Sequence, residues 1–240
     1  MATFVLVHGA WHGAWCWRRV ARLLARDGHD VFTPTLTGLG ERSHLLSPDI
    51  DLDTHILDVA NEIKWQELKD VVLVGHSYGG MVISGVAERA GKAIAAFVML
   101  DAFFSENGEA LIDLTAGPVH EALLAAAKSG ATSLPPRSAA AFKVNDNDRA
   151  WVDAQCTPQP IGCMLQKLTL TGARERIVHH AYIRATAYPS EPFDRGLAKA
   201  RAQGWRTYEV PCGHDVMLDE PERLAAILTE VAARAVAATA

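Results

Sequence analysis

A serine lies in a Gly-x-Ser-x-Gly pentapeptide formed by residues 75–79. The pentapeptide comes directly after an apolar run, residues 71–74, and before a segment whose apolar residues have helical spacing. A sharp turn between a strand and a helix raises a serine hydroxyl above the sheet, where a neighbouring base can remove its proton. Ser77 is therefore the predicted nucleophile, and a simple turn serine is the weaker alternative.

His214 is the best placed of the ten histidines to act as that base. It lies in the loop between a strand predicted over residues 207–210 and the last helix. A loop at this point can carry an imidazole over the serine, and the histidine then follows the serine in chain order. We predict His214 as the general base; a surface histidine, or one at the start of a helix, is the alternative.

The loop after the first predicted strand, residues 8–11, supplies a candidate hydrogen-bond donor for a developing oxyanion. In a strand-turn-helix site of this kind, one backbone N–H comes from this loop and another from the residue after the nucleophile. These donors are predicted to be Ala10 and Tyr78. His8 is expected to hold the loop by hydrogen bonds rather than to take part in the reaction.

The carboxylate that would orient His214 has two candidates. The strand predicted over residues 177–186 ends without an acid, whereas Asp101 ends the strand before it and could reach the histidine from there. Asp194 lies further along the expected loop, but it also suits the first turn of a helix over residues 195–203, where a carboxylate favours the helix dipole. Asp101 is therefore the predicted partner of His214, and Asp194 remains the alternative.

These side chains need a sheet to position them. Uninterrupted apolar strands are typical of a parallel sheet that is covered on both faces. Their alternation with amphipathic helices implies right-handed crossovers, so the predicted fold class is α/β, a doubly wound, mostly parallel six-stranded sheet. Strands are predicted over residues 2–7, 29–34, 70–74, 95–100, 177–186 and 207–210, and helices over 17–27, 51–64, 81–90 and 195–203.

The alternation is interrupted once, after the fourth strand. Residues 105–176 carry Ala-rich helical pieces and several prolines but no convincing strand, which predicts a helical cap. The core is then formed by residues 1–104 and 177–240. Apolar side chains near the serine or in the cap are predicted to line the substrate pocket, although plain packing is the more common role of such residues. They are Trp11, Phe103, Phe104, Trp151 and Met164.

The composition excludes several classes of protein. Of the 240 residues, 49% are hydrophobic and 21% are charged, and the formal net charge is −5, as in a folded globular protein. The chain has a pI of about 6.0 and no run of Lys or Arg, so it lacks the basic face of proteins that bind nucleic acids or anionic membranes. The expected partner is a small molecule, with no nucleic acid and no membrane.

The amino-terminal residues 1–7 lack the basic and small-residue features of a signal peptide, and no stretch is apolar enough for a transmembrane helix. The cysteines show no Cys-x-x-Cys spacing, so we expect reduced, buried thiols and neither disulfides nor a metal site. A cytoplasmic location is predicted, and a homodimer is left open. The four cysteines are Cys16, Cys156, Cys163 and Cys212.

Three motifs together resemble one branch of a known superfamily. Residues 5–15 (VLVHGAWHGAW), residues 75–80 (GHSYGG) and the pair Gly213-His214 are similar to the hydroxynitrile lyase and plant methyl esterase branch of the α/β-hydrolases, and to small bacterial esterases like it. The similarity extends over residues 3–105 and 177–231. It implies an α/β-hydrolase fold with serine chemistry that needs no cofactor.

That branch contains two chemistries. Hydroxynitrile lyases resemble esterases in which a threonine follows the first-strand histidine and a lysine follows the catalytic one, but here these positions hold Gly9 and Asp215. A carboxylate would repel a departing cyanide. The predicted function is therefore a serine hydrolase that cleaves small, mostly apolar carboxylic esters through an acyl-enzyme. A cofactor-free C–C lyase stays an alternative. A non-enzymatic ligand-binding homologue is another, because Thr186 or Ala187 stands at the usual acid position.

Overall fold

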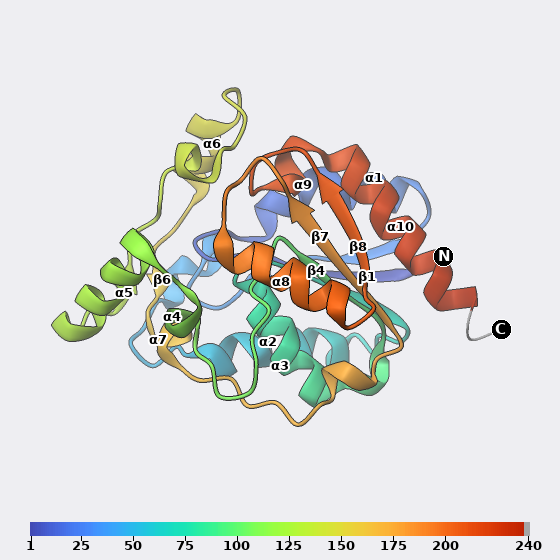
Figure 1. Cartoon of the computed structure of the whole chain (residues 1–240), viewed down its shortest axis with the longest axis horizontal. Helices are drawn as coiled ribbons and strands as arrows, with labels where there is room; N and C mark the ends of the chain where they lie inside the picture. The colour runs from blue at the N-terminus through green and yellow to red at the C-terminus, as the bar shows by residue number, and fades with distance from the viewer. Residues whose placement is uncertain (238–240) are drawn as a thin grey trace.

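The computed structural model describes residues 1–237, and the side chains of residues 1–235. Its centre is a parallel sheet of six strands in the order β2-β1-β3-β4-β7-β8 (Figure 1). Every residue of β3 is buried, as expected for a strand between two layers of helices. The predicted α/β class and doubly wound sheet are confirmed. The strands are β1 (Thr3–Val7), β2 (Asp30–Phe32), β3 (Val71–His76), β4 (Ile94–Leu100), β7 (His179–Ala185) and β8 (Arg206–Val210).

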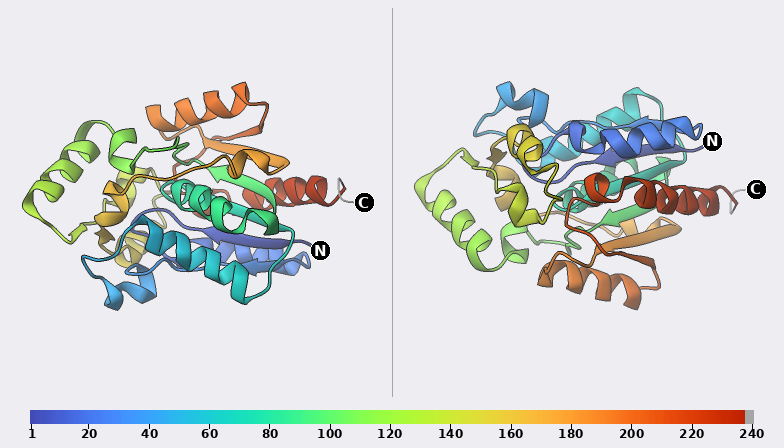
Figure 2. Two further views of the ribbon diagram at one scale, coloured as in Figure 1. Left: turned by 90° about the horizontal axis from the view of Figure 1, so that it is seen from below. Right: turned by 90° about the horizontal axis from the view of Figure 1, so that it is seen from above.

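Helices cover both faces of the sheet. In Figure 2, α1 (Arg18–Arg26) and α10 (Pro221–Ala237) lie together on one face, and α2 (Leu52–Trp65) and α3 (Gly79–Ala90) lie on the other. Helix α8 (Glu191–Ala202) packs along β7 and β8. In the part of the chain that the structure describes, no helix is long and apolar enough to cross a membrane.

The segment between β4 and β7 projects beyond one end of the sheet, with α5 and α6 farthest out (Figure 1). It contains one feature that the sequence analysis missed, an antiparallel pair of two-residue strands, β5 and β6. Strands this short have no periodicity to detect. The division of the chain into core and cap stays a prediction. The segment comprises α4 (Leu111–Leu114), α5 (Gly117–Ser129), β5 (Ser133–Leu134), η4 (Ala139–Phe142), α6 (Arg149–Gln155), β6 (Gln159–Pro160), α7 (Gly162–Leu165) and η5 (Arg174–Arg176).

Helix α8 starts earlier than the range predicted for it. Helix α8 begins at Glu191 rather than at Arg195, since a proline is favourable in a first turn. Asp194 is therefore inside this first turn. The short elements are η1 (Ala14–Trp17), η2 (Gly40–Leu45), η3 (Gly91–Ala93) and α9 (Val216–Asp219).

Candidate active site

Ser77 forms the sharp turn between β3 and α3. Its φ of 55° lies in the left-handed region, which is strained for a residue with a side chain. Its N–H donates to the carbonyl of Leu100 at 3.1 Å, and its own carbonyl accepts from Gly80 at 3.0 Å. A Cβ at Gly79 would lie only 2.8 Å from the carbonyl oxygen of His8. The glycine that follows the serine motif therefore lets the turn pack against the end of β1.

Asp101 and His214 form a close, buried pair beside this turn. Nδ1 of His214 lies 2.6 Å from Oδ2 of Asp101, and the two residues are 3% and 0% exposed. The other carboxylate oxygen accepts from the backbone N–H of Ala185 at 3.0 Å and from Arg184 at 2.8 Å. Because the carboxylate only accepts, Nδ1 of the ring carries the proton and Nε2 is left as the basic atom.

Asp194 occupies a different place from Asp101. It accepts from Nε of Arg184 at 2.9 Å, and its side chain is 64% exposed. Arg184 thus bridges the two carboxylates, with Asp101 on the side of His214 and Asp194 on the side of solvent. The two acids that the sequence left as alternatives have separate contacts, and Asp101 is the one bonded to the histidine.

Two aromatic rings stack on the imidazole of His214 and restrict its orientation. Phe193 is stacked on the imidazole with centroids 5.1 Å apart and 10° between planes, and Tyr188 lies at 4.8 Å and 28°. The backbone N–H of His214 donates to the carbonyl of Phe142 at 2.9 Å, which ties this loop to the segment after β4. The sequence analysis missed these three aromatic residues, because they are distant from His214 in the chain and no motif marks them.

The loop that carries Ala10 lies directly against the serine. A Cβ at Gly9 would come within 3.0 Å of the Cβ of Ser77. Nδ1 of His8 donates to the Gly9 carbonyl at 2.8 Å, while burial lowers the pKa of His8 to about 3 and keeps the ring neutral. Within residues 1–237, neither the N–H of Ala10 nor that of Tyr78 donates to a protein acceptor. Both predicted oxyanion donors are therefore free.

A second histidine–aspartate pair lies behind this site, and the sequence analysis missed it. Nε2 of His12 is 3.0 Å from Oδ2 of Asp215, and Nδ1 of His12 is 2.8 Å from the carbonyl oxygen of Ala10. Burial by itself raises the pKa of Asp215, but the neighbouring His12 outweighs it and holds this pKa well below its usual range. Asp215 is thus a carboxylate with a buried partner.

Known proteins are similar in sequence to this chain. The sequence profile of the "Alpha/beta hydrolase family" matches residues 4–227. The chain belongs to the alpha/beta hydrolase family. It is 43% identical over 239 residues to a carbendazim hydrolyzing esterase of Nocardioides sp. (strain SG-4G), covering 94% of this chain and 97% of that protein.

Plant proteins and solved structures are also similar to this alpha/beta hydrolase. Methylesterase 1 of Arabidopsis thaliana is 36% identical over 106 residues, which cover 43% of this chain and 40% of that protein. An extracellular alpha/beta-hydrolase from a Paenibacillus species has a structure that matches with a TM-score of 0.84 at 25% identity, covering 96% of this chain and 99% of that chain. The predicted resemblance to the methyl esterase branch is confirmed.

Two of the predicted pocket residues of this hydrolase lie among the groups around the site. The backbone N–H of Trp11 donates to Oε1 of Gln159 at 3.1 Å, and its indole ring lies 5.9 Å from that of Phe142. Phe103 packs edge-on against Phe193, with centroids 4.9 Å apart. Trp11 and Phe103 therefore contact the aromatic rings that surround His214.

Two other predicted pocket residues pack against tryptophan rings, and their place in a pocket stays a prediction. The Phe104 ring packs against Trp205, at 4.8 Å between centroids. Trp151 packs edge-on against Trp15 at 5.1 Å, so its ring fills the space between α6 and η1. Met164 is buried on α7, and its role in a pocket stays a prediction.

One group of side chains could be considered as a metal site. In the part of the hydrolase that the structure describes, ligand atoms of His76, His214 and Asp215 lie within 4.8 Å of one another. Each side chain already has a protein partner: His214 contacts Asp101, Asp215 contacts His12, and Nε2 of His76 donates to the carbonyl of His214 at 3.1 Å. Because each side chain is already held by a protein contact, we do not assign this group as a metal site.

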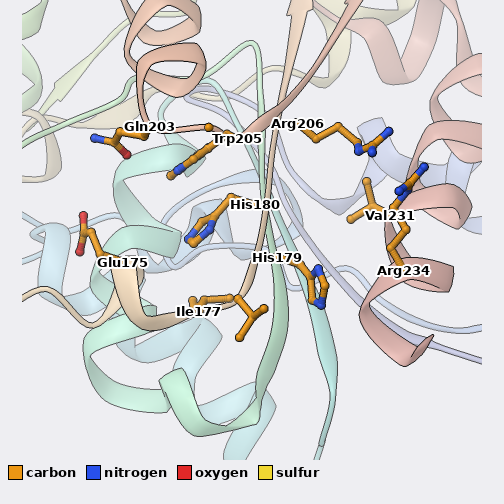
Figure 3. Close-up of a pocket in the computed structure, with 11 residues that line it drawn as sticks. Glu175, Ile177, His179, His180, Gln203, Trp205, Arg206, Val231 and Arg234 are labelled. Atoms are coloured by element: carbon orange, nitrogen blue, oxygen red, sulfur yellow. The ribbon is translucent and has the colours of Figure 1, made fainter. Parts of the chain in front are cut away.

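A separate hollow of about 930 Å³ lies at the opposite end of the sheet (Figure 3). Its lining includes His180 near the start of β7 and Trp205 just before β8, and their rings are stacked 4.5 Å apart. Arg206 on its rim pairs with Glu230 at 3.1 Å. Since Ser77 follows the carboxyl end of β3, the length of the parallel strands separates this hollow from the serine.

Proposed function

We propose that the protein is a serine hydrolase that cleaves small, mostly apolar carboxylic esters. The observation that carries this proposal is the 2.6 Å contact between His214 and Asp101, next to a serine in a strand-turn-helix elbow. The ester-hydrolysing relatives support the same reaction class. The pair of free N–H groups at Ala10 and Tyr78 supplies the remaining element of acyl transfer.

The proposed reaction follows from what each group can do. Ser77 Oγ attacks the ester carbonyl carbon while Nε2 of His214 takes the hydroxyl proton. Asp101 stabilises the imidazolium that forms, and the N–H groups of Ala10 and Tyr78 donate to the oxyanion of the tetrahedral intermediate. The imidazolium then protonates the leaving alcohol. Water attacks the acyl-enzyme through the same steps and releases the acid.

The surroundings of His214 favour an apolar substrate. Aromatic rings stack on or approach the imidazole from several sides, and residues 105–176 are proposed to form a cap over them. Methyl esters of aromatic acids are the first candidates, because the relatives include methylesterases. A cytoplasmic location and a homodimer stay predictions. The rings closest to the histidine are Phe142, Tyr188 and Phe193.

The alternative lyase chemistry has less support. A threonine in place of Gly9 would bring a Cβ within 3.0 Å of the Ser77 Cβ and 2.9 Å of the His76 ring. The position after His214 holds Asp215, which is paired with His12 and offers no cation to a leaving cyanide. Cyanide release from mandelonitrile at a rate above that of ester hydrolysis would reverse this preference.

A fluorophosphonate probe and an ester panel test the proposed function. Intact mass spectrometry should detect one adduct, located at Ser77, and the Ser77→Ala variant should remain unlabelled. Acetate and butyrate esters of a chromogenic phenol, methyl esters of aromatic acids and carbendazim form the panel. A native protein that neither reacts with the probe nor hydrolyses any ester would favour a ligand-binding homologue instead.

A further inference from the structure

His12 and Asp215 connect the two loops on which the proposed reaction depends. His12 lies two residues after Ala10, the proposed oxyanion donor, and Asp215 directly follows His214, the proposed base. Their side chains meet at 3.0 Å, and the two residues are 1% and 0% exposed. The pair therefore forms a direct, buried contact between the loop after β1 and the loop after β8.

Both nitrogens of the His12 ring face atoms that only accept hydrogen bonds. Nε2 faces the carboxylate of Asp215, and Nδ1 faces the carbonyl oxygen of Ala10 at 2.8 Å. Satisfying both acceptors requires a proton on each nitrogen, which is the imidazolium form. Burial alone would lower the pKa of His12, but the charge and hydrogen bond of Asp215 outweigh it and raise this pKa.

The second N–H of His12 fixes a peptide plane in the oxyanion loop. The carbonyl of that peptide, at Ala10, accepts from His12, and its N–H, at Trp11, donates to Gln159 at 3.1 Å. The preceding peptide is held at its carbonyl by His8. Because the C=O and N–H of a trans peptide point in opposite directions, these contacts leave the N–H of Ala10 unused and fix its orientation.

Stability is a weak reason for a buried ion pair at this position. Removing two charges from water costs free energy, and apolar residues of the same volume often leave a protein equally stable or more stable. The neighbours of His12 would suit such a replacement, since its ring stacks on Trp15 at 5.0 Å and lies 6.0 Å from Phe142. An apolar pair could not, however, supply an N–H to the Ala10 carbonyl.

We propose that His12 and Asp215 are positioning residues that hold the oxyanion loop in its working conformation during ester hydrolysis. The inference rests on the proposed function. Asp215 keeps both nitrogens of His12 protonated, and His12 in turn fixes the peptide next to the Ala10 N–H. An oxyanion donor acts mainly in the transition state, so loss of the pair lowers kcat and leaves KM nearly unchanged.

A double variant separates this role from a contribution to stability. His12→Leu/Asp215→Leu replaces the ion pair with apolar side chains and removes both charges together with the N–H that Ala10 accepts. We expect kcat to fall about 10- to 100-fold with KM within about threefold, because one oxyanion donor is misplaced but still present. The melting temperature should stay near that of the wild type. A leucine variant with wild-type kcat would overturn the proposal.

A second double variant restores the hydrogen bond without the charges. In His12→Asn/Asp215→Asn the amide nitrogen at position 12 can stand where Nδ1 stood and donate to Ala10. We expect kcat to recover to within about fivefold of the wild type, since neutral hydrogen bonds are only moderately weaker than charged ones. A rate no better than that of the leucine variant would contradict the assigned contact, and this variant keeps the test available if the leucine pair fails to fold.

Two controls complete the design. The backbone N–H groups of Thr171 and Ala173 donate to the side-chain carboxylate of Glu88 on α3. Glu88→Gln weakens these hydrogen bonds, so it should lower the melting temperature while kcat stays unchanged. Wild-type protein run beside the variants separates the two proposals. Absence of labelling and hydrolysis in the wild type would reject the serine hydrolase itself, whereas an active wild type with an equally active leucine variant would reject only the positioning role.

Discussion

Within the described residues, two buried histidine–aspartate pairs at hydrogen-bond distance have the same chemistry and different roles. In the first, His214 meets Asp101 at 2.6 Å, and in the second, His12 meets Asp215 at 3.0 Å. The two pairs differ in the contact made by the second nitrogen of the histidine ring. In His12 it donates to the main-chain carbonyl of Ala10, so both of its nitrogens are engaged. A histidine beside a carboxylate can act as a base only when its other nitrogen is free to accept a proton.

The two carboxylates also differ in what surrounds them. Asp101 accepts from Arg184 and from the backbone N–H of Ala185 as well as from its histidine. For Asp215, His12 is the one side-chain donor within hydrogen-bond distance in the described residues, and its Oδ1 has no partner there. Removing Asp101 should therefore disturb an extended network, whereas removing Asp215 should act mainly through the charge of His12.

The largest effect is expected at the first pair. His214→Ala removes the proposed acceptor of the Ser77 proton, and kcat should fall by about 10,000-fold or more. Stopped assays with a chromogenic butyrate ester measure the residual rate. Labelling of Ser77 by a fluorophosphonate should slow in parallel. If the variant kept more than one hundredth of the wild-type rate, His214 would not be the base, and it would no longer differ from His12 in this role.

Asp101→Asn should have the next largest effect. The amide no longer stabilises the imidazolium and can favour the wrong tautomer of His214, so we expect kcat to fall about 1,000- to 10,000-fold. The same esters measure it, with circular dichroism to check that the fold is retained. A loss below tenfold would mean that Asp101 does not orient the histidine.

Buried neutral histidines predict a loss of stability in acid, in contrast to the charged His12. Burial lowers the pKa of His8 to about 3, that of His55 to about 4 and that of His76 well below its usual value. The unfolded chain binds protons at these rings below about pH 6.5, whereas the folded protein does not. The free energy of unfolding should therefore fall between about pH 6 and 4, by about 1.4 kcal/mol per pH unit for each ring.

Urea unfolding at several pH values between 7 and 5 measures this slope. The His55→Gln variant is the matched comparison, because it removes one of the three rings and should flatten the slope by about one third. His12 acts in the opposite sense: its raised pKa adds stability that is fully present below about pH 6.5 and is lost as the pH rises through that pKa. A wild-type profile that is flat down to pH 5 would contradict the assigned neutral rings.

The smallest effect is expected at the acid that lies outside both pairs. Asp194→Asn removes a carboxylate that contacts Arg184 but not His214, so kcat should change by less than about threefold. It is the matched control for Asp101→Asn, since both substitutions remove one charge next to the same arginine. A collapse of the rate in Asp194→Asn alone would assign the triad acid to α8 instead.

Most of the sheet was predictable because its signal is local. Apolar runs located all six strands to within a few residues, and the strand-turn-helix context identified the turn at Ser77. The two-residue strands β5 and β6 were missed, because a pair held together by two facing residues leaves no pattern in the chain. Phe104 and Trp151 were predicted as pocket residues from residue type and position in the chain, and neither tells which neighbour a ring will contact.

The sequence by itself determined the nucleophile elbow, the histidine loop and the order of strands and helices that brings them to one edge of a sheet. Only the tertiary structure decided which acid meets His214, which histidine meets Asp215 and which rings surround the site. These contacts join residues 113 and 203 positions apart in the chain. Local patterns report the conformation of a few neighbouring residues, whereas pairing over such separations depends on where the packed core places each loop.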